Sequence, residues 1–416
     1  MGAVGLRETA VPIDRPSGFT FKEGGLIRAI WPASGAVNEI PAMDGLRGVA
    51  ILLVLMVHSS YELSTQSSDS SLTKVLNRTG AFWGLGGTGV HLFFVLSGFL
   101  LFIPYAKAAI ERRPFPDSRR FFVRRALRIL PAYWISLIVL TILAVSVQGV
   151  WYGWGDILLH VGLVHNVSQE TRGTIDGPYW TLAVESQFYV MIPLIGWLVY
   201  RLYQRRQWRY LTCVAVGIGL AGVFAGLLNI FIQRHVPALS SHRGAWEVIG
   251  FLPTFGCGIV CSFLFLLYRR CIAGTTGDRA VMYFKAAGLF GIAIIGSHTV
   301  LVAAGFSLGK IDYFFFAPMM GMAYAGILLG TFGWRLWNVV LSSAPMRFVG
   351  GISYSVYLWH YPIYQDVLIP FAVRHGGGVG QWLLVVLGTL IVILPVCLLS
   401  YHLFEKPFIR ARQVRH

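Results

Sequence analysis

Charged residues are scarce in this sequence. Only 12% of the 416 residues are Asp, Glu, Lys or Arg, whereas 56% are hydrophobic, and the mean hydropathy is +0.64. A chain of this composition cannot bury its apolar surface in one ordinary core, which excludes a water-soluble globular protein. The composition predicts a polytopic membrane protein.

Acidic residues are the scarcer charged type, because 18 Asp and Glu stand against 34 Lys and Arg, for a formal net charge of +16. In membrane proteins Lys and Arg gather in segments that stay in the cytoplasm. When alternate segments are placed inside, starting with the N-terminus, seven basic residues fall outside: Lys74, Arg78, Arg172, Arg234, Arg243, Lys310 and Arg374. We therefore predict that both termini are cytoplasmic. The excess charge is then explained by this bias and by anionic lipid headgroups, and we exclude nucleic-acid binding.

Cysteine is also rare. The five cysteines are an odd number, and most lie inside or beside apolar runs, so the sequence predicts no disulfide framework. Cys257 and Cys261 are one helical turn apart, a spacing that suits two metal ligands or two small packing residues. Buried free cysteines usually pack as small apolar residues. We therefore predict no metal site.

Ten apolar runs approach the roughly 20 residues that a helix needs to cross a bilayer. They cover residues 46–61, 86–106, 129–149, 180–200, 211–232, 247–268, 284–304, 311–332, 347–372 and 380–404. The sequence thus predicts an all-α fold of about ten transmembrane helices, forming one domain over residues 43–408. We expect residues 1–42 to form a flexible cytoplasmic tail and residues 409–416 a short basic one.

Arg47 and His58 both lie on the first predicted helix, in the string DGLRGVAILLVLMVH. Eleven steps of 100° bring the two side chains onto one face, about 16 Å apart along the axis. If Arg47 marks the cytoplasmic rim, His58 lies about half-way across the hydrocarbon core, a costly depth unless it lines a cavity. We interpret His58 as a buried catalytic histidine.

Three arginines, Arg124, Arg125 and Arg128, lie within about one turn at the start of the third predicted helix. The preference of basic residues for the cytoplasmic side would alone explain this cluster. Guanidinium groups also bind phosphate through a planar fork of donors. A cytosolic donor that carries phosphates, such as coenzyme A, would suit them, and the residues alone leave both interpretations open.

Glu185 lies near the outer end of the fourth predicted helix, in the string PYWTLAVESQFYVMIPL. A carboxylate among apolar residues must be paired, protonated or functional. It could pair with Arg or His in helix packing, orient a catalytic histidine or bind an acceptor hydroxyl. Ser97, on the second predicted helix, could line the pocket beside His58 or only assist helix packing. His360 is the second choice for a working histidine.

Five strings in this order resemble the membrane-bound acyltransferase family 3 over roughly residues 41–408: DGLRGVAILLVLMVH, GVHLFFVLSGFLL, RRALRILPAYW, YWTLAVESQFY and ISYSVYLWHYPI. The positions that match the essential Arg–His pair, the basic pair and the acidic position of this family are Arg47, His58, Arg125, Arg128 and Glu185. One position departs from the pattern, since His91 stands where the family often has an acidic residue.

The resemblance implies transfer of an acyl group, often acetyl, from cytoplasmic acyl-CoA to a hydroxyl of an envelope glycan, a glycolipid or a macrolide-type secondary metabolite. His58 would act as general base or carry the acyl group. The donor phosphates would be held by Arg47 and the cluster of Arg124, Arg125 and Arg128. The other substrate-binding residues would be Ser97, Tyr179, Trp180 and His360. No permanently bound cofactor is implied, because acyl-CoA is a substrate.

The alternative is a proton-coupled or organic-anion transporter, since intramembrane His, Arg and Glu residues also line transport paths. The two halves of the sequence show no obvious internal repeat, which disfavours it. Some relatives in the family carry an extracytoplasmic hydrolase domain, whereas this sequence has no Gly-Asp-Ser string. We therefore expect the membrane domain to modify the acceptor alone or to pass the acyl group to a separate partner. The expected location is the bacterial cytoplasmic membrane, and the oligomeric state stays open.

Overall fold

The computed structural model describes residues 40–66, 80, 84–204, 224, 247–272, 277–306, 310–375 and 379–409. Helices joined by turns and short irregular loops account for these residues, and none of them forms a strand. The predicted all-α fold is thus confirmed. Of the two predicted tails, residues 1–39 and 410–416 lie outside the described residues, and the first helix of the described part begins at Pro41.

Eight helices in the described part of the chain are long and apolar enough to cross a membrane. They are Pro41–Gln66, Leu85–Glu111, Ser118–Gln148, Gly177–Gln204, Val248–Arg270, Asp278–Ala303, Phe315–Gly333 and Gly380–Ile409. Each overlaps one of the ten predicted runs. The run predicted at 211–232 lies outside the described residues, apart from residue 224.

The helices named below belong to these spans or to the segments that connect them. They are α2 (Pro41–Gln66), α5 (Gly89–Glu111), α6 (Ser118–Leu143), α7 (Trp154–Val161), α8 (Trp180–Gln204), α11 (Glu247–Ile272), α12 (Gly277–Ala303), α13 (Lys310–Gly333), α14 (Arg335–Leu341), α15 (Ala344–Gly351), α16 (Ser353–Ile363), the π-helix η6 (Tyr364–Leu368), α17 (Ile369–Arg374), α18 (Val379–Gly388), α19 (Leu394–Ser400) and the π-helix η8 (Tyr401–Glu405).

The remaining predicted run, 347–372, is divided among α15, α16, η6 and α17. From Ser353 to Arg374 the chain is helical again, but this stretch contains four tyrosines together with His360, Gln365 and Asp366, and it is not among the eight apolar helices of the described residues. Its residues from Ser355 to His360 are all buried in the protein. A helix that is covered by its neighbours needs no continuous apolar surface toward lipid, which explains how polar residues occur here.

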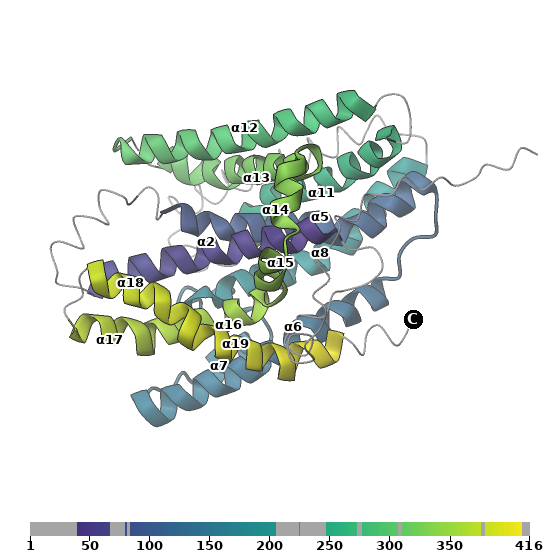
Figure 1. Ribbon diagram of the computed structural model, residues 1–416. Helices are drawn as coiled ribbons and strands as arrows, with labels where there is room; N and C mark the ends of the chain where they lie inside the picture. Colours follow the sequence, from purple (N-terminus) through teal and green to yellow (C-terminus); the bar gives the residue numbers. More distant parts are fainter. Residues whose placement is uncertain are drawn as a thin grey trace, which may run out of the picture.

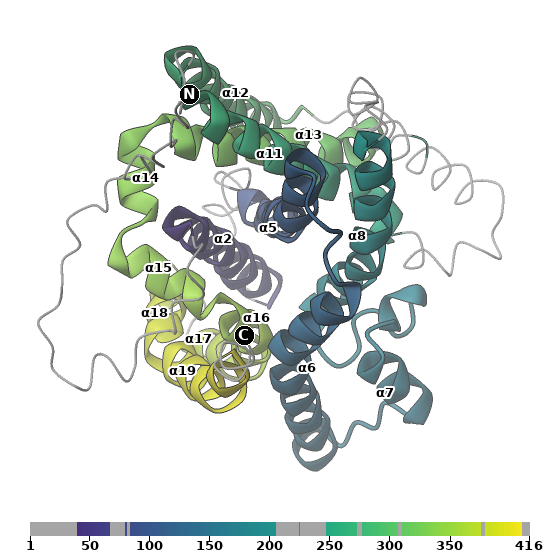
Figure 2. The ribbon, with the colours of Figure 1, turned by 90° about the vertical axis from the view of Figure 1, so that its right-hand side faces the viewer.

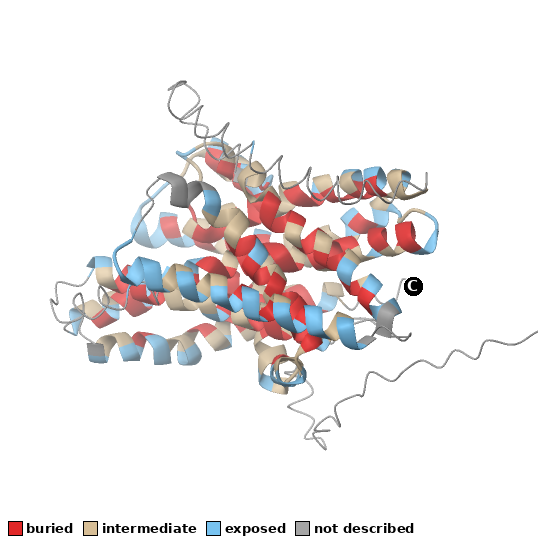
Figure 3. Cartoon of the chain, turned by 90° about the horizontal axis from the view of Figure 1, so that it is seen from above, coloured by how far each residue is buried: buried red, intermediate tan, exposed pale blue. Residues whose placement is uncertain are grey.

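The long helices form a bundle with α2 and α5 at its centre. Figure 2 looks along the bundle and shows these two helices encircled by α6, α8, α11, α13, α14 and α15 and by the group α16 to α19. In Figure 1, α14 and α15 run across the direction of the long helices. Buried residues concentrate on the inner helices (Figure 3), whereas α12 presents exposed apolar side chains such as Leu289 and Phe290. These exposed side chains are the surface that lipid covers in a membrane protein.

Glycine permits the central helices to approach closely. A Cβ added to Gly98 of α5 would lie 2.2 Å from the carbonyl oxygen of Phe255, and one added to Gly258 of α11 would lie 2.1 Å from that of Val95. Small residues at such crossings let two backbones touch, which is a common way to pack helices in a membrane. Here the close crossing fixes α5, which carries Ser97, against α11.

The two ends of the bundle differ in charge. The start of α2 packs against α14 and α15, because Gly45 approaches the backbone of Leu341 and Gly350 approaches that of Asp44. The basic residues of this end include Arg47, Arg125, Arg128, Lys285, Arg335 and Arg347. The opposite end, where α2 finishes, carries acidic residues that include Glu62, Asp156, Asp176 and Asp366.

Candidate active site

A cavity of about 90 Å³ lies among α2, α5, α6, α8 and α16. We call it the arginine cavity, and its polar lining consists of Arg47, Ser97, Arg125, Arg128, Thr181, Glu185, Tyr189, Ser353, Tyr354 and Tyr357. Five of the site residues predicted from the sequence are in this lining, and they come from four different helices. Tertiary packing therefore brings the predicted basic and acidic positions together.

Positive charge dominates the arginine cavity. Arg47 is held by Asp44 three residues earlier on α2, with 2.8 Å between Nη1 and Oδ1. Arg128 lies close enough to Arg47 for the two charges to interact. Three guanidinium groups against the carboxylates of Asp44 and Glu185 leave an excess of positive charge. Such a cavity suits an anionic ligand, and guanidinium forks are particularly suited to phosphate.

Glu185, on α8, lines the same cavity. Its Oε1 accepts a hydrogen bond of 2.5 Å from the hydroxyl of Ser97, which joins α8 to α5. Among the roles considered for Glu185 from the sequence, the structure places the carboxylate with the arginines, whereas His58 does not line the arginine cavity. A carboxylate in this position can orient guanidinium groups and accept donors from a ligand.

The histidine pair, His58 and His360, lies at a second place along the bundle. The two ring centroids are 5.1 Å apart and the planes are tilted by 60°. His58 is half-buried on α2, and His360 is completely buried on α16. The Nδ1 atom of His360 lies 2.8 Å from the carbonyl oxygen of Tyr357. Because a carbonyl only accepts, Nδ1 carries the proton and Nε2 presents its lone pair as a base.

An outer polar cluster adjoins the histidine pair and was not identified from the sequence. It consists of Glu62, Tyr361 and Gln365. Glu62 accepts hydrogen bonds from the Tyr361 hydroxyl at 3.2 Å and from the Gln365 amide at 3.0 Å. The signal that could have revealed it is the spacing of Glu62, since a residue four positions after His58 falls on the same helical face.

Tyr357 lies between the arginine cavity and the histidine pair. Its side chain lines the cavity, and its ring centroid is 5.5 Å from that of His360. Its hydroxyl contacts the hydroxyl of Thr181 at 2.5 Å and donates to the carbonyl of Pro178 at 2.8 Å. Tyr357 therefore separates the arginine cavity from the histidine pair and contacts both.

Besides the histidine pair, three predicted site residues do not line the arginine cavity. Arg124 is half-buried on α6 beside two arginines that do. Tyr179 is fully buried and donates a hydrogen bond of 2.7 Å to Ser136. Trp180 is half-buried with the guanidinium of Arg172 stacked 4.3 Å above its ring. Roles for these residues in substrate binding stay predictions.

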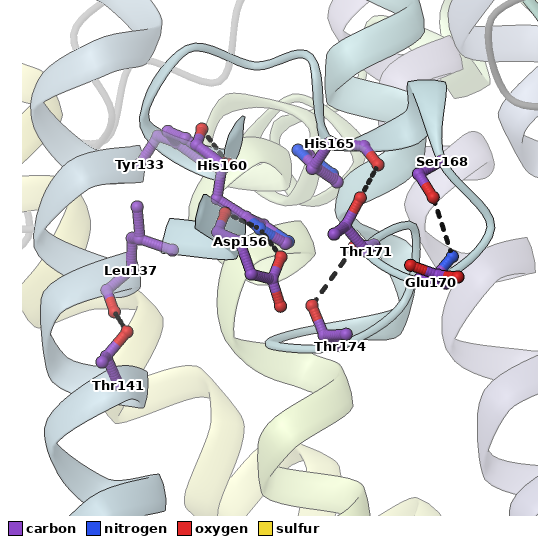
Figure 4. Close-up of polar contacts among 10 residues, drawn as sticks. All are labelled: Tyr133, Leu137, Thr141, Asp156, His160, His165, Ser168, Glu170, Thr171 and Thr174. Carbon is purple, nitrogen blue, oxygen red and sulfur yellow. Dashed lines mark hydrogen bonds and ion pairs between the residues drawn. The ribbon is translucent and has the colours of Figure 1, made fainter. Parts of the chain in front are cut away.

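The loop that connects α6 to α8, at the outer polar cluster's end of the bundle, holds buried histidines (Figure 4). His160 Nδ1 lies 3.0 Å from Asp156 Oδ1, and its ring stacks on that of His165 with 3.9 Å between centroids. Burial, reinforced by the charge of His160, lowers the pKa of His165 to about 3. Burial also lowers the pKa of His160, although Asp156 opposes this shift.

Among the described residues, no three His, Cys, Asp or Glu side chains gather as a group that could hold a metal ion.

Comparison with known proteins finds relatives of this chain among bacterial O-acetyltransferases. The chain is 25% identical to the peptidoglycan O-acetyltransferase OatA of Listeria monocytogenes, over 78% of this chain and 49% of the relative. It is 26% identical to the putative peptidoglycan O-acetyltransferase YrhL of Bacillus subtilis, over 88% of this chain and 54% of the relative. The O-acetyltransferase OatA of Staphylococcus aureus is 25% identical over 78% of this chain and 50% of the relative.

The chain thus spans about half the length of these relatives. No solved structure matches it. Residues 40–402 match the family described as the acyltransferase domain of acyltransferase family 3, which is nearly the whole of the described helical region. With eight apolar helices among its described residues and relatives from bacteria, the chain is a multi-pass bacterial membrane protein that belongs to acyltransferase family 3.

Proposed function

We propose that this protein is an integral membrane O-acyltransferase that moves an acetyl group from cytoplasmic acetyl-CoA to a hydroxyl of a cell-envelope glycan. The observation that carries the proposal is that Arg47, Arg125 and Arg128 line one cavity whose wall, Tyr357, also touches His360. Two of the relatives described above are named for O-acetylation of peptidoglycan, which supports a glycan acceptor.

The proposal includes an orientation in the bacterial cytoplasmic membrane. The basic end of the bundle, with Arg47, Lys285 and Arg347, is placed in the cytoplasm, as the distribution of Lys and Arg in membrane proteins favours. Both termini are then cytoplasmic. Ten helices result if the segment 211–232 crosses the membrane and if the covered helix from Ser353 to Arg374 is counted.

The arginine cavity would receive the donor. Coenzyme A carries phosphates at one end and a thioester at the end of its long pantetheine arm. Guanidinium groups of Arg125 and Arg128 would hold the phosphates from the cytoplasmic side, while Arg47 completes the positive surface. His58 lies about 16 Å further along α2, so the extended arm would carry the thioester toward the histidine pair.

His58 would perform the chemistry by one of two routes. As general base it would take the proton of the acceptor hydroxyl while the oxygen attacks the thioester carbonyl carbon. The carbon–sulfur bond then breaks, the acetyl group forms the ester, and the proton passes to the departing thiolate. As acyl carrier its ring nitrogen would first displace the thiolate, and the acceptor hydroxyl would then displace the imidazole.

Glu185 and Ser97 would act on the donor side of the reaction. The carboxylate, fixed by the Ser97 hydroxyl, balances the charge of the three arginines and holds their guanidinium groups toward the cavity. Preorganised groups of this kind need no rearrangement when the substrate enters. Removing either side chain should therefore weaken donor use before it affects the acceptor.

The experiment that tests the proposal is transfer of label from radiolabelled acetyl-CoA in membranes that contain the wild type or His58→Ala at matched protein levels. A bacterial envelope extract serves as acceptor pool, and His375→Ala, a change at an exposed histidine, serves as control. Transfer by the wild type and the control, and none by a folded His58→Ala, supports the proposal. Full transfer by His58→Ala would contradict the role of His58, and no transfer by any protein would contradict the donor.

The two chemical routes are separated by omitting the acceptor. If His58 carries the acyl group, acetyl-CoA alone should leave label on the wild-type protein, and His58→Ala should show none. If His58 is a general base, neither protein retains label without acceptor. In both cases His360→Ala should slow transfer, because the ring that touches His58 is removed.

A further inference from the structure

We infer that the outer polar cluster of Glu62, Tyr361 and Gln365 is the subsite that binds the acceptor, and that it selects an uncharged, hydroxyl-rich ligand such as a glycan. This inference rests on the proposed function, because it assigns a place for the second substrate of that reaction. It adds three residues to the site and a chemical rule for which acceptors the protein uses.

The outer polar cluster lies next to His58. Glu62 follows His58 by one helical turn, a rise of about 6 Å on the same face of α2. The ring of Tyr361 meets that of His58 nearly edge-on, with 5.1 Å between centroids. A ligand that is bound by Glu62 and Tyr361 is therefore within reach of the His58 ring. The arginine cavity lies toward the other end of α2, where Arg47 stands, so donor and acceptor need not compete for one place.

The hydrogen-bonding groups of the cluster suit a ligand with hydroxyl groups. Glu62 offers acceptors only, whereas Tyr361 and Gln365 both donate and accept. The three side chains bind one another, and the amide of Gln365 also donates to the Tyr361 hydroxyl at 2.7 Å. A sugar hydroxyl both donates and accepts, so it can replace or extend these bonds.

The charge of the cluster decides between acceptor classes. Glu62 is only 8% exposed, and none of the ion pairs found among the described residues involves it. In its ionised form this carboxylate repels a second anion. A phosphorylated or otherwise anionic acceptor is therefore disfavoured relative to a neutral glycan.

The loop before α8 packs against the cluster and supports its position. A Cβ added to Gly177 would lie 3.0 Å from Cε1 of Tyr361, so glycine at this position permits the loop before α8 to pack on the tyrosine ring. Gln365 lies in the π-helix η6, the second residue after α16 ends at Ile363. Single turns of π-helix in α-helical segments are frequent at functional sites.

The test measures binding of two probes to the full-length protein in lipid nanodiscs by calorimetry. The probes are a β-1,4-linked tetramer of N-acetylglucosamine and free coenzyme A. We expect Glu62→Gln to weaken binding of the tetramer by about tenfold or more, which corresponds to losing one hydrogen bond to a charged group. Coenzyme A should bind this variant as well as the wild type. The matched control is Glu170→Gln, at an exposed glutamate of the same end, which should change neither affinity.

A charge exchange distinguishes a binding subsite from a structural clamp. The double variant Glu62→Gln with Gln365→Glu returns a carboxylate to the opposite side of the cluster, and we expect it to recover most of the tetramer affinity. Arg128→Gln should show the reverse pattern, with coenzyme A binding lost and tetramer binding kept. Joint loss of both ligands in Glu62→Gln, or equal tetramer binding by Glu62→Gln and wild type, would overturn the inference.

Two further outcomes separate this inference from the proposed function. If the wild type binds the tetramer through Glu62 but transfers no acetyl group, the proposed function fails and the subsite stands. A second case is that the wild type transfers acetyl groups but does not bind the tetramer, and that Glu62→Gln does not weaken binding of neutral acceptors. The subsite then fails and the proposed function stands. A phosphorylated tetramer that binds as tightly as the neutral one would overturn the selection rule.

Discussion

The hydroxyl of Ser97 donates a hydrogen bond of 2.5 Å to Glu185, and both side chains line the arginine cavity. The bond joins α5 to α8 across the centre of the bundle. Its donor is a neutral hydroxyl, although three arginines share the same cavity. The hydroxyl of Ser97 therefore helps to fix the carboxylate in the cavity that holds the guanidinium groups, where a donor substrate would approach.

Replacing Ser97 by Ala should raise the KM for acetyl-CoA and lower the melting temperature of the protein. The reason is that Glu185 loses a fixed donor, and a hydrogen bond to a charged group is worth about 1.5–3 kcal/mol. Ser146→Ala, at an exposed serine of the segment after α6, is the control and should leave both quantities unchanged. Unaltered kinetics and stability in Ser97→Ala would show that the bond to Glu185 has no role.

Replacing Arg128 by Gln should raise the KM for acetyl-CoA by about tenfold or more, because one guanidinium that would bind phosphate is removed. The KM for the acceptor should stay the same, since the outer polar cluster is not altered. Steady-state transfer kinetics with each substrate varied in turn measure both constants. Arg119→Gln, at an exposed arginine of the same helix, should behave as the wild type. A change confined to the acceptor KM would contradict the assignment of the arginine cavity to the donor.

Replacing Gly98 by Ala should lower the free energy of unfolding by about 1–3 kcal/mol, the usual cost of overpacking a core. The added Cβ would lie 2.2 Å from the backbone oxygen of Phe255, so α5 and α11 must separate. Gly87→Ala is the matched control, because nothing lies within 4 Å of a Cβ at that exposed position. Thermal unfolding in detergent measures the difference between the variants, and equal melting temperatures would argue against a close crossing.

Acid should destabilise the loop between α6 and α8. Burial lowers the pKa of His165 to about 3 in the folded protein, below its usual value near 6.5. As the pH falls below about 6.5, the unfolded chain binds a proton that the folded loop does not, so stability is lost down to about pH 3. The melting temperature should therefore fall between pH 7 and pH 4.

The variant His165→Phe keeps an aromatic ring against His160 but removes the titrating group, and we expect a shallower dependence of melting temperature on pH. His375→Phe, at an exposed histidine, should retain the slope of the wild type. Identical slopes for His165→Phe and the wild type would mean that other groups cause the loss of stability in acid.

The agreement between sequence and structure is best where a single helix carries the information. The eight apolar helices were predictable from run length, because lipid requires continuous apolar surface. The run at 347–372 was not predictable in detail. The helix α16 is covered by other helices, so polar residues such as His360 and Tyr357 can occur on it. The length and hydropathy of a run do not show which side of the helix packs against other helices and which side faces lipid.

The site shows the same division. Arg47 and His58 were predictable as a pair from helical geometry, but the sequence did not say that Arg47 belongs to a cavity that His58 does not line. Glu62 was overlooked, although it is one turn from His58. Its partners, Tyr361 and Gln365, are about 300 positions away in the chain, and no local spacing connects them to α2.

The sequence by itself determined the membrane location, the helical fold and the residue types of the site, because bilayer thickness and the cost of buried charge act on each helix separately. Tertiary structure alone decided which of these residues meet. The gathering of Ser97, Glu185 and the arginines in one cavity depends on close crossings between distant helices, such as that of Gly98 with α11. Contacts of this kind arise from the shapes of packed surfaces, which no single stretch of sequence contains.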